Sequence, residues 1–159
     1  MTVRPIRPDD VSAVVGLVRE LADYEKALHE VRLTEETLSA SLFGDAPALF
    51  GHVAVADDGA VVGMALWFLN FSTWRGTHGI YLEDLYVQPR HRGTGLGREL
   101  LRTLAEVCVQ RGYERLEWSV LDWNAPSIGF YKAAGAVPMD EWTVFRLTDD
   151  ALTGFAATR

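Results

Sequence analysis

A glycine-rich segment past the middle of the chain has the residue types and spacing that point most directly to chemistry. It follows an apolar, β-prone run, precedes a helical pattern, and reads Val87-Gln88-Pro89-Arg90-His91-Arg92-Gly93-Thr94-Gly95-Leu96-Gly97. Glycines let backbone N–H groups approach a ligand closely, and a helix start adds partial positive charge. Such a turn can cradle a pyrophosphate, with Arg90, Arg92 and Arg98 adding charge at the rim. An ordinary strand-to-helix turn is the alternative.

Two well-known phosphate motifs fit this segment poorly. A P-loop ends in Gly-Lys-Ser/Thr, whereas Gly97 is followed by Arg98-Glu99. A dinucleotide-binding fingerprint is Gly-x-Gly-x-x-Gly in the first strand–helix unit, but here the spacing is Gly93-x-Gly95-x-Gly97 and lies past the middle. Neither motif therefore accounts for the segment, and an ordinary strand-to-helix turn stays open beside a pyrophosphate site.

The run before the glycines carries two adjacent carboxylates, Glu83 and Asp84, within a predicted strand. Strand side chains alternate, so Glu83 is expected to share a face with Tyr81, and Asp84 to face the opposite way unless the strand is bulged. An unpaired charge in an apolar strand is costly. Glu83 is therefore a candidate proton acceptor or cation ligand, with an ion pair to an arginine as the alternative.

Strands and helices interleave along the chain, which favours an α/β or α+β class with a mixed sheet. Strands are predicted at residues 3–7, 48–56, 60–69, 80–87, 115–121 and 143–147, and the pair around Asp57-Asp58-Gly59 is a hairpin. Helices are predicted after Asp9 or Asp10, after Thr34-Glu35-Glu36-Thr37, which resembles a capping box, over residues 95–110, with Gly112 ending the helix, and over residues 126–134. No repeat or linker interrupts the 159 residues, so a single domain, 1–159, is expected.

Composition excludes several classes of function. The net charge of −7 argues against broad nucleic-acid binding, and it is compatible with a cationic substrate or simply with a solvated surface. No apolar stretch is long enough to span a membrane, and the first residues do not resemble a signal peptide, so a cytoplasmic location is expected. The single cysteine and four scattered histidines predict no metal site.

The order of elements and the segment Arg92–Gly97 resemble GCN5-related N-acetyltransferases (GNAT), whose signature is Gln/Arg-x-x-Gly-x-Gly/Ala. The resemblance implies a mixed, mostly antiparallel sheet of about seven strands, four to five helices, and splayed strands at the cofactor site. Residues 81–87, 20–26 and 121–124 further resemble the diamine (spermidine/spermine-type) acetyltransferases, and residues 72–76 are most similar to the thialysine-acetylating branch. Ser72 stands where the polyamine enzymes have an acidic residue, which departs from a spermidine or spermine assignment.

The resemblance implies acetyl-coenzyme A as cofactor and assigns roles to individual residues. Tyr131 would protonate the thiolate of coenzyme A, and Glu83 would take a proton from the amine, directly or through water. The side chains themselves make Tyr24, Glu25, Trp74, Glu83 and Asp84 candidates for the amine pocket, because carboxylates and aromatic faces attract ammonium groups. The cofactor would contact Leu85, Tyr86, Val87, Arg92, Gly93, Thr94, Gly95, Leu96, Gly97, Arg98, Asn124, Ser127, Tyr131 and Lys132.

The expected activity is acetyl transfer to the primary amine of a small molecule such as a diamine, a polyamine or a lysine-like compound, by direct attack in a ternary complex. The alternatives are acetylation of proteins or peptides and a non-catalytic coenzyme A sensor. The resemblance also implies a homodimer that pairs through its C-terminal halves.

Overall fold

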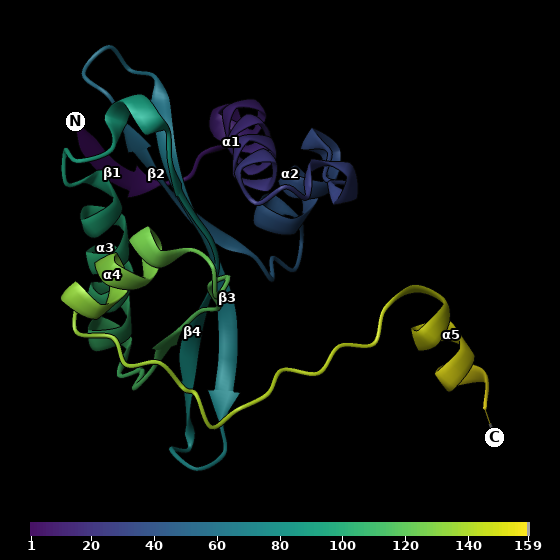
Figure 1. Cartoon of the computed structure of the whole chain (residues 1–159). Coiled ribbons are helices and arrows are strands. Elements are labelled where there is room, and N and C mark those ends of the chain that lie inside the picture. The colour runs from purple at the N-terminus through teal and green to yellow at the C-terminus, as the bar shows by residue number, and fades with distance from the viewer. Residues whose placement is uncertain (159) are drawn as a thin grey trace. The chain divides into compact units, whose positions relative to one another are not determined.

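The computed structural model describes residues 1–158, and the chain forms two compact units, Met1–Ser119 and Val120–Arg159. The first unit contains one mixed sheet with helices on both faces (Figure 1). The second unit contains the last two helices. The expectation of a single domain over residues 1–159 stays a prediction.

The sheet has five strands in the order β1-β2-β3-β4-β5, fewer than the seven expected, although the α+β class is confirmed. The strands are β1 Thr2–Pro5, β2 Phe50–Val55, β3 Val61–Ser72, β4 Thr77–Val87 and β5 Leu116–Glu117. The first four pair antiparallel and β5 joins β4 in parallel. The predicted hairpin is confirmed, since β2 and β3 pair antiparallel. Gly59 has φ +87°, a conformation that allows the tight turn between them.

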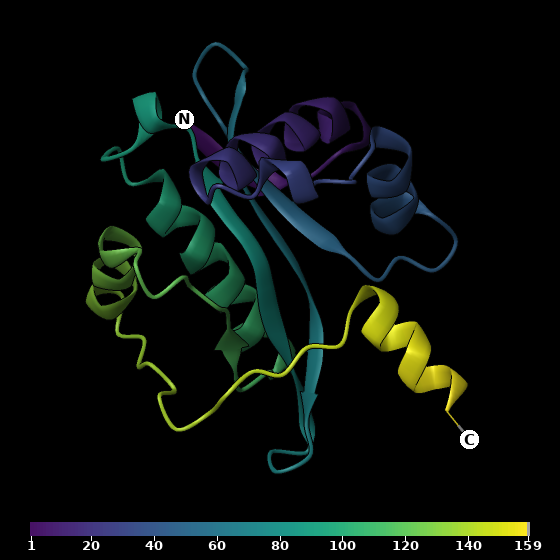
Figure 2. The ribbon, with the colours of Figure 1, turned by 45° about the vertical axis from the view of Figure 1, so that its right-hand side comes forward.

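Helices cover the two faces of this sheet. Helix α1 (Val11–Tyr24) and helix α2 (Glu35–Phe43) lie on one face, and α3 (Leu96–Arg111) lies on the other (Figures 1 and 2). Short 3₁₀ turns occur at Pro8–Asp10, Leu28–Glu30 and Pro89–His91. The predicted capping box at Thr34 is present, since its hydroxyl accepts from Thr37 N at 3.2 Å. Gly112 ends α3 in the left-handed conformation, as expected.

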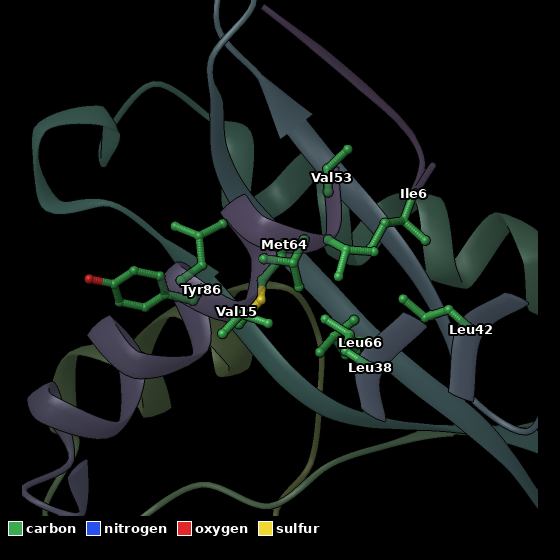
Figure 3. Close-up of a cluster of buried hydrophobic side chains, with 11 residues drawn as sticks. Ile6, Val15, Leu38, Leu42, Val53, Met64, Leu66 and Tyr86 are labelled. Atoms are coloured by element: carbon green, nitrogen blue, oxygen red, sulfur yellow. The ribbon is translucent and has the colours of Figure 1, made fainter. Parts of the chain in front are cut away.

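The core between α1, α2 and the sheet contains the apolar positions that recur at helical spacing in the first helix. Val11, Val14, Val15 and Leu17 are buried there, and Val18 and Leu21 are partly buried. They pack against strand residues of β2, β3 and β4, which include Val53, Met64, Leu66 and Tyr86 (Figure 3). This packing holds α1 against one face of β4, the strand that leads into the glycine-rich segment.

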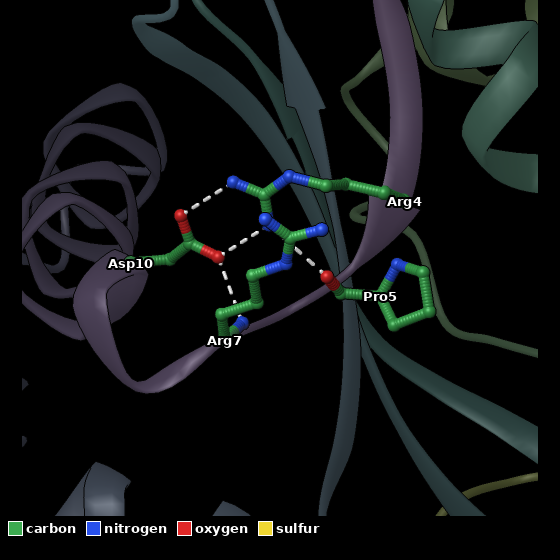
Figure 4. A network of polar contacts seen from close by, with 4 residues as sticks. All are labelled: Arg4, Pro5, Arg7 and Asp10. Atoms are coloured by element: carbon green, nitrogen blue, oxygen red, sulfur yellow. Dashed lines mark hydrogen bonds and ion pairs between the residues drawn. The ribbon is translucent and has the colours of Figure 1, made fainter.

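A buried ion pair ties β1 to the start of α1 (Figure 4). Arg4 donates to both carboxylate oxygens of Asp10, at 2.6 and 2.8 Å, and Arg7 N donates to Asp10 Oδ2 at 2.7 Å. The hydrogen bond from Arg4 is the main cause that lowers the pKa of Asp10. Asp10 therefore positions the helix through tertiary contacts, and its carboxylate makes no capping bond to α1.

The second unit departs from the sequence prediction at its end. The predicted helix is present as α4 (Ala125–Ala133), but residues 143–147 form no strand, and α5 (Asp149–Ala157) was not expected. A strand needs a backbone partner, and residues 143–147 have none in the described part of the chain. No helix within residues 1–158 is long and apolar enough to cross a membrane.

Candidate active site

The glycine-rich segment forms an open cradle at the start of α3. Gly93 and Gly95 have φ of +76° and +92°, and a Cβ added at either position would meet no atom within 4 Å. The first α-helical bond runs from Glu99 N to Gly95 O at 2.9 Å, so the N–H groups of Leu96, Gly97 and Arg98 precede it. Positive φ, open space and unused donors at a helix start fit a pyrophosphate, which supports the predicted cofactor residues Gly93 to Arg98.

The Arg92 side chain turns back toward the protein. Its Nε donates to Val87 O at 2.9 Å, and its guanidinium carbon lies 5.3 Å from the Tyr24 ring centroid and 5.4 Å from that of Tyr86. Cation–π contacts of this kind fasten the loop to α1 and β4. Arg92 therefore contacts Tyr24 and Tyr86, two of the predicted site residues, and holds the glycine-rich loop beside them. The sequence spacing alone did not indicate this contact.

Glu20 extends this brace, and sequence reasoning did not single it out as a site residue. Its carboxylate accepts from Gln88 Nε2 at 2.9 Å, and it is hydrogen-bonded to the Tyr86 hydroxyl. Burial, followed by the negative charge of Glu20, raises the pKa of Tyr86. Its position four residues before Tyr24 on the same helix face was the signal available in the sequence.

A β-bulge at Glu83 breaks the predicted alternation along β4. Leu82 pairs with Trp67 and Asp84 with the neighbouring Leu66, so Glu83 is the extra residue. Tyr81 pairs with Phe68, and their rings lie 5.1 Å apart. Residues 66 and 68 share a face of β3, so Tyr81 and Asp84 lie together on the α1 side. Simple alternation, which would group Tyr81 with Glu83, therefore does not hold here, and the bulge is the exception that the sequence prediction allowed for Asp84.

Three carboxylates gather where α1 ends beside this bulge. Glu25 is the C-terminal cap of α1, Glu83 is exposed, and Asp84 is half-buried. Burial, followed by the charges of Glu83 and then Glu25, raises the pKa of Asp84 to about 6. Burial also raises the pKa of Glu25. A cation would relieve this repulsion, so the cluster is suited to binding an ammonium group and accepting its proton.

The strand that carries these groups is splayed from its neighbour, as expected. β4 and β5 pair only at Ile80–Leu116 and Tyr81–Glu117. Beyond Tyr81 the edge of β4 on that side has no ladder partner among residues 1–158, and this edge includes the predicted cofactor contacts Leu85, Tyr86 and Val87. An amide-bearing arm could add to such an edge as an extra strand would.

The remaining predicted cofactor residues lie on α4 in the second unit. Asn124 is buried and caps the helix, its Oδ1 accepting from Ser127 N at 3.3 Å. Tyr131 is half-buried beside Phe130, with ring centroids 5.2 Å apart, and Lys132 is exposed. Their contacts with the cofactor, and Tyr131 as the acid, stay predictions.

Trp74 lies in the turn between β3 and β4 with 89% of its surface exposed. About seven strand residues separate this turn from Asp84, a distance on the order of 20 Å. One chain therefore does not bring Trp74 to the carboxylate cluster, and its role in the amine pocket stays a prediction. Within residues 1–158 no three or more His, Cys, Asp or Glu side chains, the carboxylate cluster included, form a group that could hold a metal ion.

Several known proteins are similar to this chain over most of its length. The chain is 38% identical to the thialysine N-epsilon-acetyltransferase of Bos taurus, over 97% of this chain and 96% of that protein. It is 28% identical to L-ornithine N5-acetyltransferase NATA1 of Arabidopsis thaliana, over 94% of this chain and 85% of that one. An integron cassette protein of V. cholerae superimposes with a TM-score of 0.82 and 25% identity, over 99% of this chain and 98% of that one. Residues 16–136 match the model of the Acetyltransferase (GNAT) family, and the chain therefore belongs to that family as an N-acetyltransferase.

Proposed function

We propose that this enzyme transfers the acetyl group of acetyl-coenzyme A to the primary amine of a small cationic molecule. The substrate class is that of lysine-like amino acids, including thialysine and ornithine, together with diamines. The observation that carries the proposal is the cluster of Glu25, Glu83 and Asp84 on the strand and helix that lead to the phosphate cradle. The names of the relatives described above support this substrate class.

Acetyl-coenzyme A would supply an acetyl thioester, and the residues of this chain would do the rest. The N–H groups of Leu96, Gly97 and Arg98 would bind its pyrophosphate, and the free edge of β4 would bind its amide-bearing arm. The carboxylate cluster would orient the ammonium group of the substrate. An ammonium has no lone pair, and a free alkylamine has a pKa near ~10, so a proton must be removed before attack.

The adjacent carboxylates Glu83 and Asp84 would share that task. Glu83 is reachable from solvent, and burial, followed by the charges of Glu83 and Glu25, raises the pKa of Asp84 to about 6, which favours Asp84 as a proton acceptor. Tyr131 would donate a proton to the leaving thiolate.

A steady-state panel tests the substrate class. Acetyl-coenzyme A turnover is measured with ornithine, lysine, thialysine, putrescine and spermidine, and with a lysine-containing peptide. Turnover confined to the small amines is the expected result. Preference for the peptide would favour the protein acetyltransferase, and cofactor binding without turnover of any amine would favour the sensor.

Variants of the proposed acid and base test the chemistry. Tyr131→Phe should lower kcat by roughly 10²–10⁴-fold with cofactor affinity retained. Glu83→Gln should lower kcat in a way that higher pH partly rescues, because more free amine is then in solution. Tyr113→Phe is the matched control. If Glu83 only holds the ammonium, its variant raises KM instead, and near-normal turnover in Tyr131→Phe returns that tyrosine to a packing role.

We further propose a homodimer. In the second unit a series of large apolar side chains is exposed, which is unusual for a surface that meets only water. It comprises Val137, Met139, Trp142, Val144, Phe145, Leu147, Leu152 and Phe155. In the predicted dimer, which pairs through its C-terminal halves, these side chains would be covered by a second copy of the chain.

A further inference from the structure

A pocket outside the proposed acetyl-transfer site lies in the first unit, near the end of β1 and the start of β2. It encloses about 370 Å³ and lies between the end of α2, the start of β2 and the last turn of α3. Most of its wall is apolar, with Phe50 and Trp67 stacked at 4.7 Å between ring centroids. None of the residues assigned above to the cofactor or the amine lines it. Its size suits a small ligand.

One polar group in this wall is a buried histidine with a defined tautomer. His52 is 8% exposed, and its Nδ1 accepts a hydrogen bond from Trp67 Nε1 at 3.2 Å. An indole N–H only donates, so Nδ1 must be unprotonated and the neutral ring carries its proton on Nε2. Burial, and then the charge of Arg111, lower the pKa of His52 and keep the ring neutral.

The other nitrogen of this ring is available to a ligand. Within residues 1–158, Nε2 has no hydrogen-bond partner, and it is not among the sealed, unpartnered side-chain atoms. It therefore reaches open space, and the space that His52 lines is this pocket. A neutral N–H donor on a mostly apolar wall favours a ligand that brings an acceptor.

Arg111 supplies the second polar group. It is the last residue of α3, and its guanidinium carbon lies 5.9 Å from the centroid of the Trp67 ring. No carboxylate lies within ion-pair distance of it in the described part of the chain. The chain has 22 acidic residues, yet none lines this pocket. The positive charge at its mouth is thus not neutralised by the protein.

We propose that this pocket binds a small carboxylate with an apolar body. The carboxylate would accept from the guanidinium of Arg111 and from His52 Nε2–H, and the apolar body would lie against Phe50 and Trp67. A ligand with both a carboxylate and an apolar body suits the pocket, because the pocket offers hydrogen-bond donors, a cation and an apolar wall but no acidic side chain. It is independent of the acetyl-transfer site, since no residue is shared.

Calorimetric titration of the full chain with 3-phenylpropionate tests the proposal, with the neutral 3-phenylpropanamide as matched probe. The amide should bind about tenfold more weakly than the carboxylate, and Arg111→Gln should remove that difference. Arg102→Gln, an exposed arginine on the same helix, should leave it unchanged. The Trp67 indole N–H signal in NMR, assigned with Trp67→Phe, should shift on titration.

Three results would overturn the proposal. They are equal affinity for the acid and the amide, unchanged acid affinity in folded Arg111→Gln, and no binding up to roughly 10 mM, where even a weak fragment-sized ligand would be detected. Because none of these measurements involves acetyl transfer, the proposed enzyme function can fail or succeed separately.

Discussion

Asp84 shows how one extra residue in a strand changes the chemistry of a side chain. Its carboxylate is on the α1 side of the sheet, with Glu25 and Glu83 close enough for their charges to raise its pKa. Burial is the larger cause. A group whose pKa is about 6 exchanges a proton readily near neutral pH, which is the property that a general base needs.

The raised pKa of Asp84 predicts a stability change in Asp84→Asn. The folded protein holds this proton more tightly than the unfolded chain, so the charge on Asp84 destabilises the fold increasingly as pH rises from about 4 to about 6. The shift of about two pKa units corresponds to about 3 kcal/mol. Asp84→Asn should therefore raise Tm at pH 7.5 more than at pH 4.5, as measured by thermal melts.

The exposed neighbour provides the control for that melt series. Glu83→Gln removes an equal charge from a solvated position, and its effect on Tm should be smaller. A Tm difference for Asp84→Asn that does not change with pH would show that this carboxylate is not held in a costly environment.

At the scale of the element, the starts of α3 and α1 are positioned by different kinds of interaction. The proposed phosphate cradle depends on local backbone geometry, in which Gly93 and Gly95 adopt positive φ. The position of α1 depends on the long-range pair between Arg4 and Asp10. Each can be tested by a single substitution.

Gly95→Ala should abolish or strongly weaken cofactor binding. The new methyl group meets no protein atom within 4 Å, so it would project into the space assigned to the pyrophosphate. Gly59→Ala is a matched control, because Gly59 has φ +87° against +92° for Gly95 and equally open surroundings. Both variants should lose about 1–2 kcal/mol of stability, but only Gly95→Ala should lose affinity for acetyl-coenzyme A in a direct titration. If both variants bound acetyl-coenzyme A with equal affinity, the assignment of the cofactor to this loop would be wrong.

Asp10→Asn should destabilise the first unit by about 2–4 kcal/mol at pH 7, because it leaves the Arg4 guanidinium without its charge partner. The pKa of Asp10 is lowered in the folded state, so the stabilisation is present above pH 4 and is lost as pH falls through the folded value. Denaturant titrations at pH 7 and pH 3 measure it. The gap between Asp10→Asn and the parent should be smaller at the lower pH, and a constant gap would contradict an electrostatic origin.

At the scale of the whole molecule, the exposed apolar side chains of the second unit predict self-association. Sedimentation at micromolar concentration should show a dimer. Phe145→Ser, which changes a side chain that is 92% exposed, should weaken it. Val109→Ser on α3, where the residue is 80% exposed, is the control and should leave the dimer intact. A monomeric parent protein would contradict the homodimer.

The sequence by itself determined the features that depend on neighbouring residues. The hairpin at Gly59, the capping box at Thr34, the end of α3 at Gly112 and the glycine cradle all follow from local backbone preferences, and they were predicted. The signature around Arg92 and the adjacent carboxylates likewise sufficed to indicate the family that the comparisons confirm.

Only the tertiary structure decided which side chains meet. The bulge at Glu83 arises from pairing with β3, so alternation along β4 could not predict that Asp84 lies with Tyr81. The predicted strand at residues 143–147 failed because a strand needs a partner that composition does not supply. His52, Trp67 and Arg111 are 15 and 44 residues apart in sequence, and their pocket exists because β2, β3 and α3 pack together. Contacts between distant segments depend on packing, which no local pattern encodes.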